Sequence, residues 1–403
     1  MTSIRQTSSS DAYGDAIEID QTPPSDDDDD GDAANRGLSM NGRSSASPAP
    51  RQALSEADKS LAAYLLARSV DGREVSADEL DLLKRANETV EEVRETLHLG
   101  RSNVTVELEQ TGQRNFRSAE AMRTVLERHY GNLHNVPGAI RAAMAIHVGT
   151  GFCAEHGHVT QYLHMRRLKF GESVEKVVAD DIHDHGWALA RQQPSGRVVV
   201  MDSWGEGPAI DPADAKYMKP SYGARTQHVV MHANVRPDRR AFSEAMEKTV
   251  PALLEEVELQ RRAYDTQGLH INRKSRYEPK PIIRKSFAKR SRAALDSVVL
   301  QDGRTLSRTE AKLREGALGL AAGFHRGARN KLAELQAARL RTVRAHETKA
   351  VNVALAIGAD VQQAKACAGE IVDRARHLRR PGPSRVKEEF RVDTARSESR
   401  RGT

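Results

Sequence analysis

The spacing of apolar residues changes near residue 170, and this change constrains the fold more than any other feature of the chain. Between residues 80 and 97 apolar side chains recur at helical spacing, after a capping box at Ser76 and Glu79. Between residues 174 and 179 the period is two, which is typical of a strand. Helical spacing returns beyond residue 239. The chain is therefore predicted to be an α+β protein in which an antiparallel sheet lies between helical regions.

The individual elements are predicted from caps, breaks and the same two periods. Ser55 is placed to cap a first helix, and Gly100 to end the second. Residues 192–196, which contain Pro and Gly, predict a turn between two strands. A second capping box at residues 307–310 opens an Ala/Leu/Arg-rich stretch that extends to about residue 347. Further helices are expected at 118–130, 138–148, 153–168, 239–265 and 350–378, and strands at 185–191, 197–202 and 228–231.

Charge is segregated along the chain. Residues 1–50 hold 3 basic and 10 acidic residues, five of them in the run Asp26–Asp30, whereas residues 270–403 hold 31 basic and 14 acidic residues. With frequent serines and prolines, residues 1–52 are predicted to form a disordered N-terminal segment, and residues 381–403 a disordered tail. Such asymmetry is typical of tails and partner-binding segments.

Cysteine content and apolar runs limit the cellular setting. The chain has two cysteines, Cys153 and Cys367, which make no disulfide framework, so a reducing compartment is expected. No apolar run approaches the roughly 20 residues that a membrane-spanning helix needs. The N-terminus lacks the pattern of a secretory signal peptide and a glycine at position 2, so neither that export route nor myristoylation is indicated.

A thiol, an imidazole and a carboxylate occur in an order that suits nucleophilic catalysis. Cys153 follows the break Gly149-Thr150-Gly151 and is placed at the start of a helix. Free backbone N–H groups at such an end stabilise a thiolate or an oxyanion. His185 and Asp202 follow in the two strands of the predicted hairpin. These three residues are the candidates for nucleophile, general base and orienting group.

The hairpin gives His185 and Asp202 a physical reason to meet. If the turn centres near residue 194, the two residues lie opposite each other, or nearly so, on neighbouring strands. The Cβ atoms of directly opposed residues are about 4.5–5.5 Å apart. Trp187 and Trp204 each follow one of these residues by two positions and so share its face, where they could shield the site from water.

The same residues are also compatible with a structural role or with metal binding. A buried free cysteine and a lone strand histidine are often structural. A zinc site could draw on Cys153, His156, His158, His183 and His185, but no second ligand set completes it. Cys153-Ala154-Glu155 also echoes zinc deaminases, whose signature needs a later Pro-Cys-x-x-Cys, and Cys367 stands alone. No metal or small-molecule cofactor is therefore predicted.

Three short blocks resemble the transglutaminase-like superfamily of cysteine proteases and acyl transferases. They are Gly-x-Cys-x-Glu-His at 151–156, Asp-His-x-Trp at 184–187, and a Val-rich strand ending in Met-Asp-x-Trp at 201–204. With Gly-Glu-Gly-Pro-Ala-Ile at 205–210, the match is nearer to the AvrPphE family of type III effectors, which plant-associated bacteria inject into host cells. The resemblance covers roughly residues 115–220.

The resemblance implies a papain/transglutaminase-like core, in which a helix bearing the cysteine packs on an antiparallel sheet bearing the histidine and the aspartate. It implies that Cys153 is the nucleophile, His185 the general base and Asp202 the orienter. Relatives often have Asn before the cysteine and Gly after it, where this chain has Phe152 and Ala154. The resemblance also implies secretion through a type III system into a host cell, with the N-terminal segment as export signal and a host protein as substrate.

These expectations divide the chain into five parts. Residues 1–52 form the secretion segment, 53–112 a helical N-terminal region, 113–268 the transglutaminase-like catalytic domain, 269–380 a basic helical C-terminal region, and 381–403 the tail. The predicted activity is that of a thiol protease, or of an acyl transferase that shares its thioester intermediate. Hydrolysis, deamidation and transamidation are not separated by the sequence.

A dense basic run at residues 273–292 has several interpretations. It is either a solvated surface or linker, or a contact for a host membrane, nucleic acid or the nuclear import machinery. The alternative function is then a non-enzymatic effector or adaptor that binds host protein, anionic membrane or nucleic acid through this C-terminal region.

Overall fold

A four-stranded antiparallel sheet forms the centre of the predicted catalytic region, in a computed structural model that describes residues 54–179, 185–218, 224–231, 235–380, 382 and 385–392. The strand order is β5-β4-β3-β6. The strands are β3 (Glu172–Ala179), β4 (Gly186–Gln192), β5 (Arg197–Met201) and β6 (Ala224–Met231). The predicted α+β class is confirmed, while the predicted disorder at residues 1–52 lies outside the described residues.

The register of the β4–β5 hairpin places His185 and Asp202 two residues away from direct opposition, where the sequence predicted them to be opposite or nearly so. Ala188 pairs with Met201 as the last pair of the ladder, and the same register would place Asp202 opposite Trp187. The loop between the strands comprises residues 193–196, with its centre slightly beyond residue 194. Because side chains alternate with period two, a shift of two residues keeps His185 and Asp202 on the same face as diagonal neighbours.

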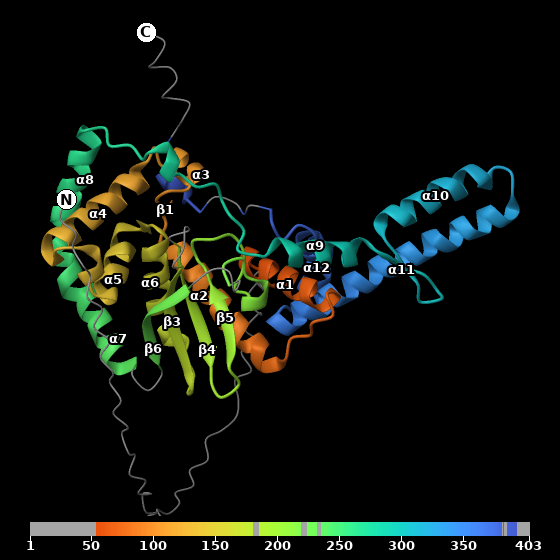
Figure 1. Ribbon diagram of the computed structural model, residues 1–403, viewed down its shortest axis with the longest axis horizontal. Coiled ribbons are helices and arrows are strands. Elements are labelled where there is room, and N and C mark those ends of the chain that lie inside the picture. Colours follow the sequence, from red (N-terminus) through yellow and green to blue (C-terminus); the bar gives the residue numbers. More distant parts are fainter. Residues whose placement is uncertain are drawn as a thin grey trace, which may run out of the picture. The chain divides into compact units, whose positions relative to one another are not determined.

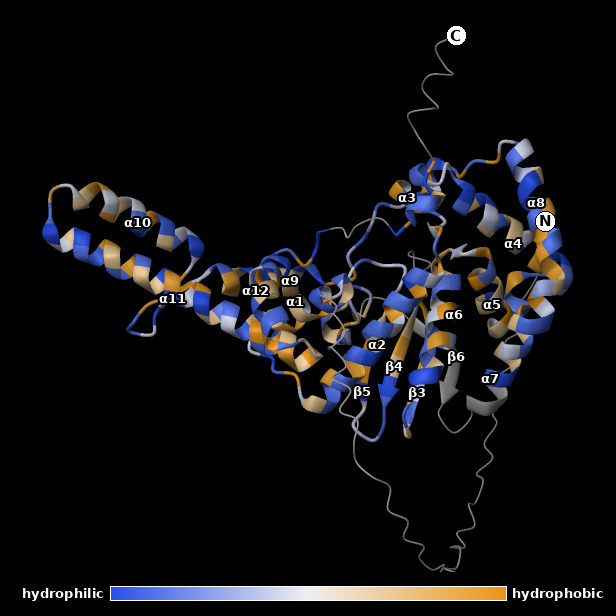
Figure 2. Ribbon diagram, turned by 180° about the vertical axis from the view of Figure 1, so that it is seen from behind, coloured by the Kyte–Doolittle hydropathy of each residue, from blue (hydrophilic) through white to orange (hydrophobic). Residues whose placement is uncertain are grey.

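Helices α2 (Ala77–Thr96) and α6 (Cys153–His164) cover one face of the sheet, as the two opposite views show (Figures 1 and 2). Helix α6 lies close to β4 because Gly157 and Gly186 face each other. A Cβ atom on Gly157 would lie 3.5 Å from the backbone carbon of Gly186. The predicted helix 153–168 ends as α6 at His164 and continues as a 3-10 turn over Met165–Arg167.

A second group of helices packs beside α6. It comprises α4 (Arg114–Tyr130), α5 (Gly138–Val148), α7 (Val235–Glu244) and α8 (Val250–Thr266). Where a single helix was predicted at 239–265, a π-helical turn at Ala245–Thr249 separates α7 from α8. A π-helical turn contains one residue more than an α-helical turn, which apolar spacing does not reveal.

The remaining long helices come from both ends of the described chain. Helix α1 (Glu56–Val70) packs against α9 (Lys285–Asp296), α11 (Arg326–Ile357) and α12 (Val361–Arg376). The helix predicted at 350–378 is interrupted at Gly358, whose φ of 111° an L-residue rarely adopts. One apolar cluster extends from Leu61 to Ala375 and includes the sheet, so these helices share its core. Helix α10 (Arg308–Ala322) packs on α11 around a smaller apolar cluster.

Short elements complete the connections. Strand β1 (Gly100–Arg101) pairs in parallel with β2 (Thr150–Gly151), α3 (Thr105–Gln110) follows β1, and β7 (Val298–Val299) pairs with β8 (Thr305–Leu306). Within the described ranges, no helix has the length and apolarity needed to cross a bilayer.

Candidate active site

Cys153, His185 and Asp202 meet at one end of the sheet. Cys153 is the first residue of α6, His185 immediately precedes β4, and Asp202 immediately follows β5. Asp202 Oδ2 lies 2.8 Å from His185 Nε2, and the Cys153 side chain also hydrogen-bonds the imidazole. Asp202 occupies Nε2, which leaves Nδ1 for the thiol. The structure thus brings together the three residues that the sequence singled out.

The turn before Cys153 is built from glycines for steric reasons. Gly149 ends α5 with φ of 77°, in the left-handed region that glycine adopts without strain. A Cβ atom on Gly151 would lie 2.5 Å from Glu155 Cβ. The two glycines allow the chain to leave α5, form the short strand β2 and enter α6 within four residues. Cys153 is thereby presented at the start of a helix with its side chain partly exposed.

Glu155 holds this helix start in place, a role that the sequence did not predict. Its Oε2 accepts the backbone N–H of Phe152 at 3.0 Å. The carboxylate also forms ion pairs of 2.7 Å with Arg123 and 2.6 Å with Arg141. Burial alone would raise the pKa of Glu155, but the two arginines hold it well below its usual range. The position of Glu155, three residues after Phe152, is the spacing of a capping residue and could have indicated this role.

A guanidinium lies over the residue that precedes the thiol. The Arg123 guanidinium stacks on the Phe152 ring at 3.9 Å from the ring centre. Burial lowers the pKa of Arg123, but Glu155 above all, and also Glu120 and Cys153, raise it. The guanidinium is therefore held by acidic groups next to the residue that precedes Cys153.

The imidazole of His185 is held as a cation. Burial lowers the pKa of His185, but the attraction and hydrogen bond of Asp202, with the hydrogen bond to Cys153, raise it to about 10. Asp202 Oδ1 accepts the backbone N–H of Gly205 at 2.8 Å. Burial raises the pKa of Asp202, whereas His185 and this N–H lower it overall. The result is a buried imidazolium–carboxylate pair with both carboxylate oxygens bonded.

Aromatic rings surround the imidazole. The ring centres of Trp187, Trp204 and Tyr217 lie 5.7, 5.2 and 4.6 Å from that of His185. All three aromatic side chains are less than 10% exposed, so they limit the access of water to the imidazole. The two tryptophans were predicted from their strand positions. Tyr217 was missed because it lies in an irregular segment that carries no periodic signal.

His156, near the thiol, has a structural role. His156 Nδ1 lies 3.2 Å from Ser203 Oγ, which also contacts Thr160 Oγ1 at 2.8 Å. Burial and the nearby Arg385 hold the pKa of His156 well below its usual range, so it stays neutral. His156 thus ties α6 to the residue that follows Asp202. Among the described residues no group of three His, Cys, Asp or Glu side chains could hold a metal ion, and His183, which the zinc alternative included, lies outside them.

Three arginines from distant segments fix the loop after Asp202, which comprises residues 203–207. Arg94 Nη2 donates to Gly205 O and Gly207 O, each at 2.8 Å. Arg101 Nη1 donates to Trp204 O at 3.0 Å, and Arg385 donates to Ser203 O and Gly205 O. Contacts between residues so far apart leave no local pattern in the sequence.

The basic run at residues 273–292 passes along the same loop. Glu206 and Pro281 form a parallel bridge, as Val104 and Tyr277 do. The ring of Tyr277 meets Trp204 edge-on at 5.7 Å. The first half of this run therefore belongs to the wall of the site.

Comparisons of the chain with protein-family models, curated proteins and solved structures found no match. The site is therefore interpreted from the chemistry and geometry of its own residues.

Proposed function

We propose that the protein is a cysteine enzyme that attacks an amide or acyl carbonyl with Cys153, a thiol protease or acyl transferase of the transglutaminase-like type. His185 is the general base and acid, and Asp202 the orienter. The observation that carries the proposal is the continuous hydrogen-bonded chain from Cys153 through His185 to Asp202, at the start of a helix. A cysteine helix packed on an antiparallel sheet also supports a papain/transglutaminase-like core.

The proposed mechanism balances each proton transfer. The Cys153 thiolate attacks the carbonyl carbon, and the backbone N–H groups at the start of α6 stabilise the oxyanion that forms. The imidazolium of His185 donates its Nδ1 proton to the leaving amine as the carbon–nitrogen bond breaks and a thioester forms. Neutral His185 then takes a proton from water or from a second amine, which attacks the thioester and releases the thiolate. Asp202 keeps the tautomer and orientation of His185 through both steps.

The biological setting that we propose is a type III effector acting on a host protein. It is supported by the resemblance of three sequence blocks and by the acidic, serine-containing composition of residues 1–52. The host compartment is left open by this proposal.

A second candidate function is binding of an anionic partner through the basic run. Arg273, Lys274, Lys285 and Lys289 are exposed, and among the described residues no acidic side chain pairs with them. This candidate needs no catalysis by Cys153.

Mass spectrometry of host-cell extracts tests the enzyme directly. Extracts exposed to wild type are compared with extracts exposed to Cys153→Ala, with Cys367→Ala as the matched control. Wild type and Cys367→Ala should produce the same new termini, deamidated glutamines or crosslinks, and Cys153→Ala none. The enzymatic proposal is wrong if a folded Cys153→Ala protein produces the same products.

A further inference from the structure

The segment 385–392, here called the C-terminal clasp, touches both halves of the site. Arg385 is 8% exposed in its side chain and donates to the carbonyls of Ser203, Trp204 and Gly205. We propose that the clasp holds the catalytic groups in register, and that Arg385 is a positioning residue for Asp202. This inference rests on the proposed function, because it concerns the control of the same site.

One peptide unit connects Arg385 to the catalytic carboxylate. The N–H of the Trp204–Gly205 peptide donates to Asp202 Oδ1 at 2.8 Å, and the C=O of the same peptide accepts from Arg385 at 3.4 Å and from Arg101 at 3.0 Å. A peptide unit is planar, so fixing its carbonyl fixes the direction of its N–H. By fixing this peptide, Arg385 and Arg101 set the direction of the N–H that hydrogen-bonds Asp202, and Asp202 in turn orients His185.

The other end of the clasp reaches the turn before the nucleophile. The Phe390 ring lies against the His98 ring, 4.6 Å between centres and tilted by 35°, and Lys387 N donates to His98 O at 3.2 Å. His98 fills the space beside Gly149, where a Cβ atom would lie 2.3 Å from the His98 ring. Gly149 begins the turn that presents Cys153. The clasp thus contacts the supports of the carboxylate and of the thiol.

The position of the Arg385 guanidinium depends on the loop at residues 203–207, because two other cations lie nearby. Burial lowers the pKa of Arg385, and the positive charges of Arg101 and Arg94 lower it further, to about 9. Glu206, 3.5 Å away, and the loop carbonyls are what retain the guanidinium there. One buried and two partly buried arginines bind the loop carbonyls, and the loop carbonyls in turn keep these arginines in place. Losing one of the three arginines should therefore loosen the loop.

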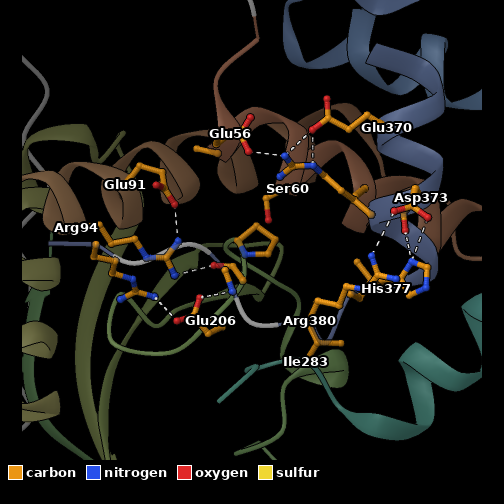
Figure 3. Close-up of a pocket in the computed structure, with 18 of the residues that line it drawn as sticks. Glu56, Ser60, Glu91, Arg94, Glu206, Ile283, Glu370, Asp373, His377 and Arg380 are labelled. Carbon is orange, nitrogen blue, oxygen red and sulfur yellow. Dashed lines mark hydrogen bonds and ion pairs between the residues drawn. The ribbon is translucent and has the colours of Figure 1, made fainter. Parts of the chain in front are cut away.

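A cavity of about 630 Å³ lies next to Arg385 and the loop, so a small solute can reach them. Figure 3 shows Arg94 and Glu206 on one side of it, and Glu370, Asp373 and His377 of the α12 end on the other. Arg385 also lines the cavity. A guanidinium ion could therefore enter from solvent and occupy the space that a shortened side chain leaves.

The experiment is alkylation of Cys153 by iodoacetamide across the pH range in the full chain, with peptide mass spectrometry to separate Cys153 from Cys367. Arg385→Ala should slow the labelling of Cys153 at pH 6 by about tenfold or more and move its pH profile upward, because a misplaced Asp202 no longer supports the imidazolium that stabilises the thiolate. Arg385→Lys should be intermediate, and added guanidinium chloride at millimolar concentration should restore the rate in Arg385→Ala. A mere loss of packing would not be rescued by guanidinium.

Two further variants complete the design. Arg391→Ala is the matched control, since Arg391 lies in the same segment but, within the described part of the chain, pairs with Glu388 and the backbone of Val386 rather than with the loop. It should leave the profile unchanged. Phe390→Ala, at the other end of the clasp, should slow labelling without guanidinium rescue, and it keeps the test available if Arg385→Ala does not fold.

The outcomes separate the two claims. If Cys153 of wild type reacts no faster than Cys367, the proposed function fails and the clasp loses its role with it. If wild-type Cys153 is reactive and folded Arg385→Ala has the same pH profile of labelling as wild type, the positioning role of the clasp is refuted while the proposed function stands. Slowed labelling that guanidinium does not restore in folded Arg385→Ala also refutes the positioning role of Arg385.

Discussion

Asp202 Oδ2 and His185 Nε2 lie 2.8 Å apart although the two residues are diagonal rather than directly opposed across the β4–β5 hairpin. Both residues lie just beyond the ends of β4 and β5, where these two strands no longer pair, although the carbonyl of His185 still accepts the N–H of Ala179 of β3 at 2.9 Å. Asp202 instead depends on the loop that follows it, through the N–H of Gly205. The geometry of the candidate site is therefore set by loop contacts as much as by the sheet.

Asp202→Asn tests the role of the carboxylate. The amide keeps the shape but does not stabilise an imidazolium, and in a known triad this substitution lowers kcat about 10⁴-fold. We expect a loss on the order of 10³–10⁴-fold in the rate of product formation, with the fold retained by circular dichroism. Asp302→Asn, at an exposed turn, is the control and should have wild-type activity. An Asp202→Asn enzyme with wild-type kcat would remove the carboxylate from the mechanism.

The pKa of His185 predicts how stability changes with pH. It is about 10 in the folded protein and near 6.5 in an unfolded chain, so the native state binds the extra proton. The stabilisation is complete below about pH 6.5 and is lost as pH rises through 10. Urea unfolding of wild type and His185→Gln at several pH values between 6 and 10 measures this stabilisation. The difference in unfolding free energy between the two proteins should shrink as pH rises, and a constant difference would contradict the raised pKa.

Gly205→Ala tests the loop sterically. A Cβ atom at this position would lie 2.6 Å from Asp202 Oδ2 and 2.2 Å from Ile282 Cγ2, so either the carboxylate or the segment around residue 282 must move. We expect activity to fall by about tenfold or more, as Asp202 loses its alignment with His185. Gly319→Ala is the matched control, because a Cβ atom there meets nothing within 4 Å. Equal activity of the two variants would show that the loop tolerates displacement.

Glu155→Gln tests the support beneath the nucleophile. The substitution removes the buried anion that the partly buried guanidinium groups of Arg123 and Arg141 share, and breaking a fully buried pair typically costs about 3–5 kcal/mol. The midpoint of urea unfolding should fall accordingly. Glu127→Gln, on the exposed side of α4, should leave it unchanged. A Glu155→Gln protein as stable as wild type would mean that solvent or another group compensates the two cations.

The sequence was sufficient for the parts of the site that depend on local spacing. Period two at residues 174–179 predicted β3, and the Pro-Gly turn predicted the hairpin to within a residue at each end. His185 and Asp202 are two residues away from direct opposition, but an even shift does not change the face of a strand, so the two residues still lie on one side. The Gly-x-Gly break located the start of α6 at Cys153.

The rest depends on contacts between distant segments, which carry no periodic signal. Arg385 lies within residues predicted to be a tail, yet it is buried against the loop after Asp202. Tyr277 lies in a basic run that composition describes as surface or linker, yet it meets Trp204. Each of these side chains is explained by its partner in space, and neither partner is a neighbour in sequence.

The relative reactivity of the two cysteines is the most direct test of the central claim. Cys153 and Cys367 are both partly exposed, so exposure alone predicts similar labelling by iodoacetamide. The proposed pairing of Cys153 with the His185 imidazolium predicts that Cys153 is labelled about tenfold faster than Cys367, or more, at pH 6, and that His185→Ala abolishes the difference. Equal labelling of the two cysteines in the folded wild-type protein would contradict the catalytic assignment.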